Sequence, residues 1–452
     1  MNSESAPQTQ SLRRALTLWD LILYGIILIM PIAAVPLFGL VQQISHGHAV
    51  SALLLSMVAM VLTAVSYGRM SARFPAAGSA YTFVRHGINA HFGFMAGWAM
   101  LLDYLLVPVV CILYAALTLS RLLPSVPLWI WCALIVVLIT GINLCGIRST
   151  ATANLAMMLA ALAVVIPFMV LADWWLWHHQ GWHGLASTEP FYVPQNFSWK
   201  SLGAATALAA LTYGGFDGVS TMAEEVENPR RNVLLATVIV CVFTGVFGGM
   251  QIYLAQRVHP GFNDFPNVET AFMDVARTVG GSWLFGAMAV ILIITNLGSG
   301  LTAQAGLSRL LYGMGRDGVL PRRFFAHLSQ RSAVPAYNLL LIGTLAFLGC
   351  MVLNYERAAE LINFGAFLAF MGVNASVMRI CYFRADHASR HFFSDLLLPL
   401  AGLLFCLLIW WNLSNSAKIA GGIWFAIGLA YTAILTRGFR RTPANLDGSF
   451  TG

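Results

Sequence analysis

Charged residues are scarce in this chain. Its 452 residues include 25 lysines and arginines and 18 aspartates and glutamates, so only 10% of the chain is charged, while 58% is hydrophobic. The mean hydropathy of +0.74 excludes an ordinary soluble domain. Apolar runs of about 20 residues recur along the whole length, and a helix of that length can cross the hydrocarbon core of a bilayer. The sequence therefore predicts an all-α integral membrane protein.

Paired cysteines and metal-binding patterns are also absent from the sequence. The seven cysteines stand singly within or at the ends of apolar runs, as small packing residues do. His178, His179 and His183 cluster in one loop, but no acidic or cysteine partner completes a metal site there. No end of an apolar run carries a nucleophile and a base. We therefore predict no metal, no cofactor and no enzymatic activity.

The apolar runs predict a single transmembrane domain over residues 18–437, between tails at 1–17 and 438–452. No connection between the runs is long enough for a separate soluble domain, so the function must lie inside the helical bundle. We predict twelve membrane spans, at residues 18–44, 49–71, 91–119, 126–144, 153–176, 201–226, 232–255, 281–309, 336–353, 358–379, 395–412 and 419–437.

The basic residues predict how these spans are oriented. With an even number of spans both termini lie on one side, and nineteen of the 25 basic residues fall on that side. The other six are Arg121, Lys200, Arg257, Arg277, Arg357 and Lys418. Because cytoplasmic loops are enriched in arginine and lysine, we expect both termini in the cytoplasm of a multi-pass inner-membrane protein. The scatter of the basic residues excludes nucleic acid as the reason for the net charge of +7.

Two of the predicted spans are interrupted. The sixth contains Gly214-Gly215-Phe216-Asp217-Gly218, and the first contains a segment bounded by Pro31 and Pro36. A carboxylate at the centre of a membrane helix costs about 2.5–3.5 kcal/mol, and irregular backbone survives there only where it is buried in protein or lines a cavity. Two breaks in matching places predict inverted-repeat halves, about 18–176 and 201–379, with extra helices at 395–437 and a binding site at the breaks. The alternative is that these residues only kink packed helices.

Four sequence stretches resemble the amino acid-polyamine-organocation superfamily of secondary transporters. They are Phe74–Tyr81, Gly215–Gly218, Glu224–Asn232 and Arg309–Pro321. Two further stretches, Leu101–Leu105 and Leu361–Ala366, look most like the bacterial putrescine importers. This resemblance implies a LeuT-like fold of twelve helices, with five plus five helices in an inverted repeat, broken helices 1 and 6, and two extra helices.

The chain also departs from the pattern of this superfamily. Amino acid carriers similar to it use a glycine-serine-glycine turn in helix 1 to hold the substrate carboxylate, whereas Ile32, Ala33, Ala34 and Val35 stand at that place here. This difference favours a substrate without a carboxylate. The putrescine importers have an acidic residue near the position of Pro36, so a second ammonium would lack that partner. Coupling through a lysine on helix 5 is excluded, because no lysine or arginine lies between Arg148 and Lys200.

The candidate site residues are acidic and aromatic residues near the breaks, together with the substrate-lining segment of the first break, Ile32, Ala33, Ala34 and Val35. We predict that Asp217 binds a substrate ammonium and exchanges a proton, although it could instead cap the freed backbone. Tyr104 could contribute a hydroxyl and a ring face to an ammonium, and Asp103 could contribute a proton site, or both could only pack between helices. Phe216 is a candidate lining residue. Two more acids, Glu224 and Glu225, are candidates for an inner gate or for a helix-end network with arginines.

The function predicted from these features is import of small amines, polyamines or amino acids across the cytoplasmic membrane. The predicted mechanism is alternating access coupled to protons, with the bilayer and a small molecule as partners, and the sequence leaves the oligomeric state open. An amino acid antiporter or exchanger of the same fold is one alternative. A membrane sensor or a channel is another, although no carbonyl filter sequence is present.

Overall fold

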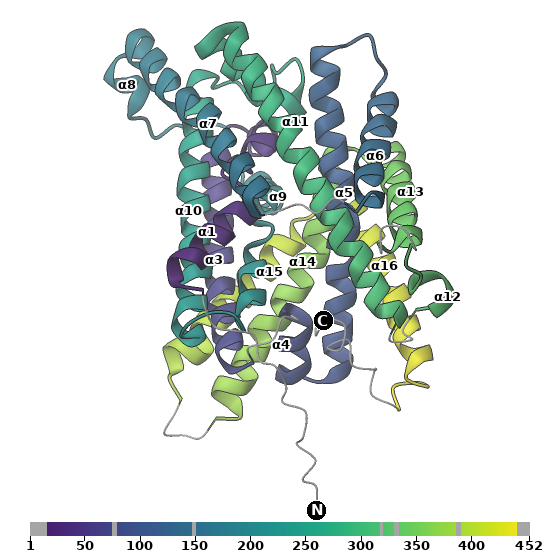
Figure 1. Ribbon diagram of the computed structural model, residues 1–452. Coiled ribbons are helices and arrows are strands. Elements are labelled where there is room, and N and C mark those ends of the chain that lie inside the picture. The colour runs from purple at the N-terminus through teal and green to yellow at the C-terminus, as the bar shows by residue number, and fades with distance from the viewer. Residues whose placement is uncertain are drawn as a thin grey trace, which may run out of the picture.

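The computed structural model describes residues 16–74, 79–146, 151–316, 320–329, 334–385 and 390–440. Most of the two predicted tails lies outside these residues, as do parts of the stretches Phe74–Tyr81 and Arg309–Pro321 that carry the family resemblance. In the described ranges all regular elements are helices, and the one extended pairing there is a single parallel bridge between Leu16 and Val226. The helices stand roughly side by side in one bundle (Figure 1).

The helical elements follow the predicted spans closely. In chain order they are α1 (Leu18–Ile29), η1 (Val35–Leu37), α2 (Phe38–Ile44), α3 (Ala49–Arg73), α4 (Ser79–Gly87), α5 (Ala90–Leu122), α6 (Leu128–Leu144), α7 (Ala151–Gln180), α8 (Trp182–Leu185), α9 (Trp199–Ala209), η2 (Ala210–Tyr213), η3 (Phe216–Met222), α10 (Pro229–Val258), η4 (Val268–Thr270), α11 (Ala271–Arg316), α12 (Arg322–Phe325), α13 (Ala336–Val352), α14 (Tyr355–Val377), η5 (Met378–Phe383), η7 (Phe392–Leu397), α15 (Leu398–Trp411) and α16 (Asn415–Leu435).

Eight helices of the described residues are long and apolar enough to cross a membrane by themselves. Four shorter apolar helices accompany them, at Leu18–Ile29, Val35–Ile44, Leu128–Leu144 and Ala336–Val352. The first two of these are the halves of the first predicted span, which the chain divides at its proline-bounded segment. The protein is therefore an all-helical, multi-pass integral membrane protein.

Side chains at the helix starts explain several of these boundaries. Thr17 and Asp20 form a reciprocal capping box at α1, in which each side chain accepts a hydrogen bond from the other's backbone N–H. The side chains of Asn89, Asn354 and Ser414 cap α5, α14 and α16 in the same sense, each accepting from an N–H of the first turn. Polar residues at the ends of apolar runs thus set where the helices begin.

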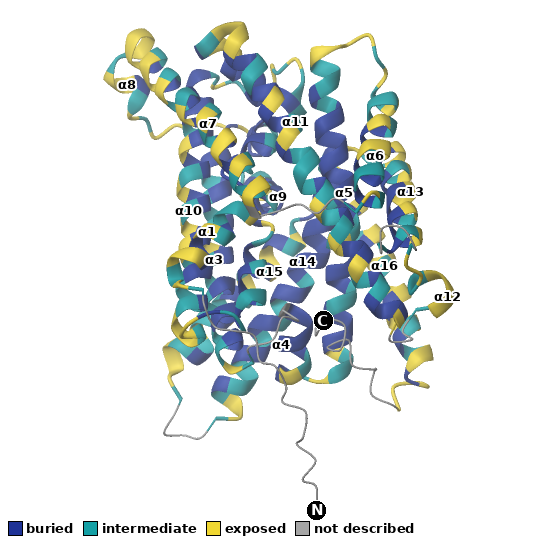
Figure 2. Ribbon diagram, in the orientation of Figure 1, coloured by how far each residue is buried: buried dark blue, intermediate teal, exposed yellow. Residues whose placement is uncertain are grey.

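Helices α5 and α14 form the interior of the bundle. About 72% of the most apolar stretch of each is buried, against 28% for α7 and 17% for α16. Figure 2 shows the same contrast, with dark blue running along α5 and α14 and yellow on the outer helices. Polar residues in a membrane protein are found mostly on such inner helices, because these helices are shielded from lipid.

Helix α4 lies outside the predicted spans. It has only nine residues and includes Arg85 and His86, so its average hydropathy does not indicate a membrane segment. Ala80, Phe83 and Val84 are nonetheless buried against the bundle. A second difference is α11, which begins ten residues before the predicted start at residue 281. Its backbone turns at Gly281, where φ is +67°, so the predicted boundary coincides with a kink.

Candidate functional site

The first span is interrupted between α1 and η1. Helix α1 ends at Ile29, and Met30 adopts a left-handed φ of 68° that is uncommon for a residue with a side chain. Proline cannot continue the helical hydrogen bonding, which frees backbone carbonyls around Pro31. The side chain of Gln251 on α10 donates a hydrogen bond to the Pro31 carbonyl at 2.9 Å. One freed backbone group is therefore satisfied by a neighbouring helix.

The sixth span is interrupted at Gly214 and Gly215. The helical turns of η2 end at Tyr213, and Gly215 has a φ of 99°, which glycine adopts without steric cost. A methyl group built on Gly215 would come 3.7 Å from the carbonyl oxygen of Leu28 near the end of α1. The Tyr213 hydroxyl fixes this break by donating to the Leu53 carbonyl at 3.0 Å. The two interrupted spans therefore meet at their breaks.

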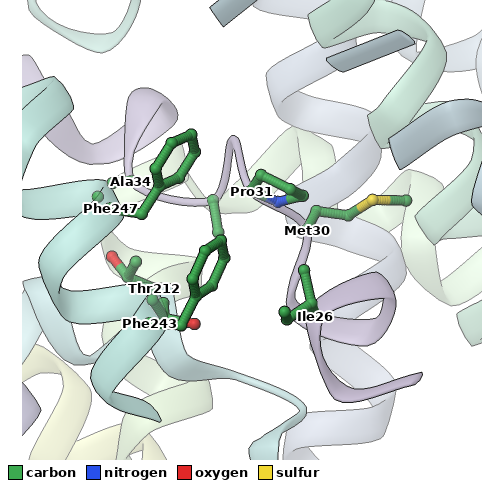
Figure 3. Close-up of a pocket in the computed structure, with 10 residues that line it drawn as sticks. Ile26, Met30, Pro31, Ala34, Thr212, Phe243 and Phe247 are labelled. Carbon is green, nitrogen blue, oxygen red and sulfur yellow. The ribbon is translucent and has the colours of Figure 1, made fainter. Parts of the chain in front are cut away.

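A small pocket of about 10 Å³, room for about one water molecule, lies beside the two breaks (Figure 3). Met30, Pro31, Ala33 and Ala34 line it from the first break, and Thr212 lines it from the second. The remaining walls come from Ile26 on α1 and from Phe243, Thr244, Phe247 and Gly248 on α10. The Thr212 hydroxyl is buried and has no hydrogen-bond partner within the described residues. A polar group at such a place can bind a ligand or a water molecule.

Asp217 is the second residue of η3, directly after the second break. It is only 8% exposed. It lies within electrostatic range of Asp103 and Tyr104 on α5, of Tyr24 on α1 and of Cys241 on α10. Tyr104 keeps 41% of its surface exposed, and Asp103 is half-buried. The three predicted residues therefore lie in one region, where two carboxyl groups are found near a partly exposed tyrosine.

Comparison with known proteins identifies the family. The amino acid permease family matches residues 16–436. The chain belongs to this family. It is 33% identical over 446 residues to the low-affinity putrescine importer PlaP of Escherichia coli (strain K12), covering 97% of this chain and 98% of the relative. Membership in this family makes the protein a permease rather than an enzyme.

Two more distant permeases are similar over much of the chain. The branched-chain amino acid permease BcaP of Bacillus subtilis (strain 168) is 25% identical over 95% of this chain and 94% of its own length. The mitochondrial cationic amino acid transporter 3 of Arabidopsis thaliana is 26% identical over 84% of this chain and 64% of its own. Relatives of the permease are thus named for amines, for cationic amino acids and for apolar amino acids.

Other predicted lining residues of the permease are packed into its core. Phe216 is 1% exposed and makes edge-to-face contacts with Tyr67 and Phe370, with ring centroids 5.4 and 5.2 Å apart. Ile32 and Val35 are buried as well, at 3% and 1% exposure, and they do not line the pocket at the breaks. In this conformation these three side chains are therefore core residues.

Glu224 and Glu225 lie in the short segment between η3 and α10, and both are half-buried. The described residues show no ion pair between these glutamates and Arg230 or Arg231. The backbone of the segment is instead paired with the N-terminal approach to α1. Leu16 donates to the Glu225 carbonyl at 3.0 Å and accepts from the Glu227 N–H at 2.9 Å. This pairing joins the segment before α10 to the chain that enters α1.

Sequence reasoning did not single out Tyr24, Thr212, Phe243 or Phe247. Tyr24 stands about two helical turns before Pro31 on the first span, so the position of the proline break could have indicated it. Phe243 and Phe247 are four residues apart and stack on one face of α10 at 5.3 Å. No sequence signal relates that face to the breaks, because the relation depends on how α10 packs.

Proposed function

We propose that the permease imports small organic amines, and diamines of the putrescine class in particular, by alternating access at the two helix breaks. The observation that carries this proposal is the buried carboxylate of Asp217 at a helix break, within electrostatic range of Asp103 and Tyr104. A buried carboxylate needs a cation or a proton to balance its charge. An ammonium group is a cation that also donates hydrogen bonds to a carboxylate.

The chemistry of the first break supports an amine over an amino acid. Pro31 supplies no N–H group, and Ala33 and Ala34 present methyl groups to the pocket. The side chain of Gln251 already donates to the Pro31 carbonyl. An anionic substrate group would find few donors there. A substrate that carries only ammonium groups does not need them.

Two carboxylates suit a substrate with two ammonium groups. In the proposed arrangement Asp217 binds one ammonium and Asp103 binds the other, which offsets the missing acid near Pro36. Tyr104 adds its accessible ring and hydroxyl to the contact with the cation. A divalent substrate entering a negative-inside cell gains about 4.6 kcal/mol per 100 mV, since each charge contributes about 2.3 kcal/mol.

The proposed mechanism has the architecture of an inverted-repeat transporter with twelve spans and both termini in the cytoplasm of the inner membrane. The eight long helices support this count, together with the divided first span, α6, α13 and the interrupted α9–η3 segment. The excess of basic residues on the side of the termini supports the orientation. Proton coupling is part of the proposal, with Asp217 taking a proton when the ammonium leaves.

Uptake into proteoliposomes tests this function. Labelled putrescine is offered under imposed pH and voltage gradients, with lysine, leucine and butylamine as competitors. We expect putrescine to compete best, and the Asp217→Asn variant to lose at least 90% of the uptake and its response to the pH gradient. Asp264→Asn, an exposed acid in a loop, is the matched control. Preference for an amino acid, or normal uptake by Asp217→Asn, contradicts the proposal.

An exchanger of amino acids is the second candidate. The observation that favours it is the similarity to the branched-chain amino acid permease BcaP over 95% of the chain. Counterflow separates the two candidates, because an obligatory exchanger moves labelled substrate only when a counter-substrate is present inside the vesicle. Uptake of putrescine into empty vesicles excludes obligatory exchange.

A further inference from the structure

A basic pocket lies between the end of α3 and the start of α10, away from the helix breaks. It has a volume of about 500 Å³ and is lined by Arg69, Arg73 and Arg230 together with Ala72, Leu234 and Cys381. The pocket is on the side of the bundle where the N-terminal segment enters α1, because Leu16 is paired with the segment just before α10. Guanidinium groups are well suited to bind phosphate, and three arginines line this one pocket.

The charges of this pocket are not balanced by its own acids. Arg69 pairs with Asp395 at 2.5 Å and also bonds to Ser394 on η7. Arg73 and Arg230 are exposed, and within the described residues neither makes a hydrogen bond or an ion pair through its side chain. Asp395 is the only acid that faces the three arginines in a described contact. Positive charge therefore remains for a ligand.

The start of α10 gives an independent reason for an anion. Pro229, Arg230 and Arg231 form the first turn of α10, and this turn contains no acidic residue. The side chain of Asn228, the residue before the helix, does not cap its N–H groups. The positive end of the helix dipole thus carries two additional positive charges within the first turn, an arrangement that a bound anion would stabilise. Arg73 lies in the last turn of α3, where the negative end of the helix dipole stabilises its charge. No such dipole interaction stabilises the charge of Arg230, which lies at a positive helix end.

Exposed phenylalanines beside the pocket indicate that the anion belongs to a lipid. Phe383 ends η5, and Phe392 and Phe393 begin η7; they are 64%, 60% and 63% exposed. Cys381 of the pocket precedes Phe383 by two residues, and Ser394 and Asp395, which hold Arg69, follow Phe393 directly. These segments are the yellow-green elements at the lower left of Figure 1. Aromatic side chains at this level suit contact with acyl chains next to a headgroup.

We propose that this pocket binds the phosphate of an anionic phospholipid headgroup, with Arg73 and Arg230 contacting the phosphate and the phenylalanines contacting the acyl chains. Basic pockets between membrane helices are suited to this task, because the headgroup brings both charge and an apolar anchor. The bound lipid joins the end of α3 to the start of α10, and Arg69 connects the same place to η7 through Asp395.

The test uses the purified full-length permease in detergent and follows its thermal unfolding. The probes are phosphatidylglycerol, phosphatidylcholine with identical acyl chains, and soluble glycerol phosphate. Arg73→Gln/Arg230→Gln is the pocket variant. Arg322→Gln/Arg323→Gln, which removes two exposed arginines from α12, is the matched charge control. Arg230→Gln alone serves as a second variant if the double variant does not fold.

We expect phosphatidylglycerol to raise the melting temperature of the wild type and of the control, and phosphatidylcholine to have no effect. The pocket variant should need at least tenfold more phosphatidylglycerol for the same rise. Equal responses of the pocket variant and the wild type overturn the proposal, and so does an equal loss in the control variant. An equal rise with glycerol phosphate alone assigns the pocket to a soluble anion and overturns the lipid assignment.

Discussion

The side chain of Gln251 donates a hydrogen bond to the backbone carbonyl of Pro31 at 2.9 Å, joining α10 to the break in the first span. Gln251 is fully buried, so water is not available to replace it. The hydrogen bond therefore holds an interrupted helix in a bundle whose other backbone groups are mostly satisfied within their own helices. Its removal should affect stability more than most single substitutions of a polar residue.

We predict that Gln251→Met lowers the free energy of unfolding by about 1–3 kcal/mol, because a buried carbonyl loses its partner while the volume of the side chain is kept. Thermal unfolding in detergent measures this as a lower melting temperature. Gln43→Met is the control, since Gln43 is half-buried and makes no side-chain hydrogen bond within the described residues. Equal melting temperatures of the two variants would show that the Pro31 carbonyl finds another partner.

A second prediction concerns the break in the sixth span. Gly215→Ala places a side chain at a φ of 99°, which should cost about 1–3 kcal/mol, and should straighten or shift the turn that carries Asp217. We expect lower thermal stability and at least a tenfold loss of transport. Gly286→Ala in α11 is the control, because a methyl group there meets no atom within 4 Å. If Gly215→Ala transports at the wild-type rate, the positive φ is not needed for function.

The positions of the two breaks could be predicted from sequence because proline and consecutive glycines act locally on the backbone. The spans could be predicted for a similar reason, since hydropathy averages over about 20 residues. Helix α4 could not be predicted in this way, because it is short and amphipathic and its Arg85 and His86 lower the average hydropathy. Its burial depends on the neighbouring helices α5 and α14.

The directions of side chains at the candidate site were less predictable than its position. Phe216 stands next to Asp217, yet it packs against Tyr67 and Phe370 in the core. η3 turns with three residues per turn, so the helical period of 3.6 does not tell which neighbour faces the substrate. Tyr24 near Asp217 depends in the same way on how α1 packs against η3.

A third prediction concerns Arg257, which holds the connection between α7 and α9. Its guanidinium donates to the carbonyl oxygens of Gly184 and His183 and to the Gln180 side chain, and pairs with Glu189. Arg257→Gln should increase hydrogen exchange in residues 181–198 at least tenfold, because these carbonyls lose their common donor. Lys200→Gln, an exposed change beside this segment, should not. Unchanged exchange in Arg257→Gln would show that other contacts hold the connection.

The last prediction distinguishes the roles of Asp103 and Asp217 by comparing substrates with one and with two ammonium groups. If Asp103 binds the second ammonium, Asp103→Asn removes one charge-assisted hydrogen bond, worth about 1.5–3 kcal/mol, from a diamine only. The KM for putrescine should rise about 10-fold to 100-fold, while the KM for butylamine, which has the same carbon chain and one ammonium, should change less than threefold. Kinetics of labelled uptake in proteoliposomes give both values, with Asp264→Asn as the control. An equal rise in KM for both amines would contradict a direct contact between Asp103 and the second ammonium. It would indicate that Asp103 supports the structure of the site or transfers a proton, because neither role distinguishes one ammonium from two.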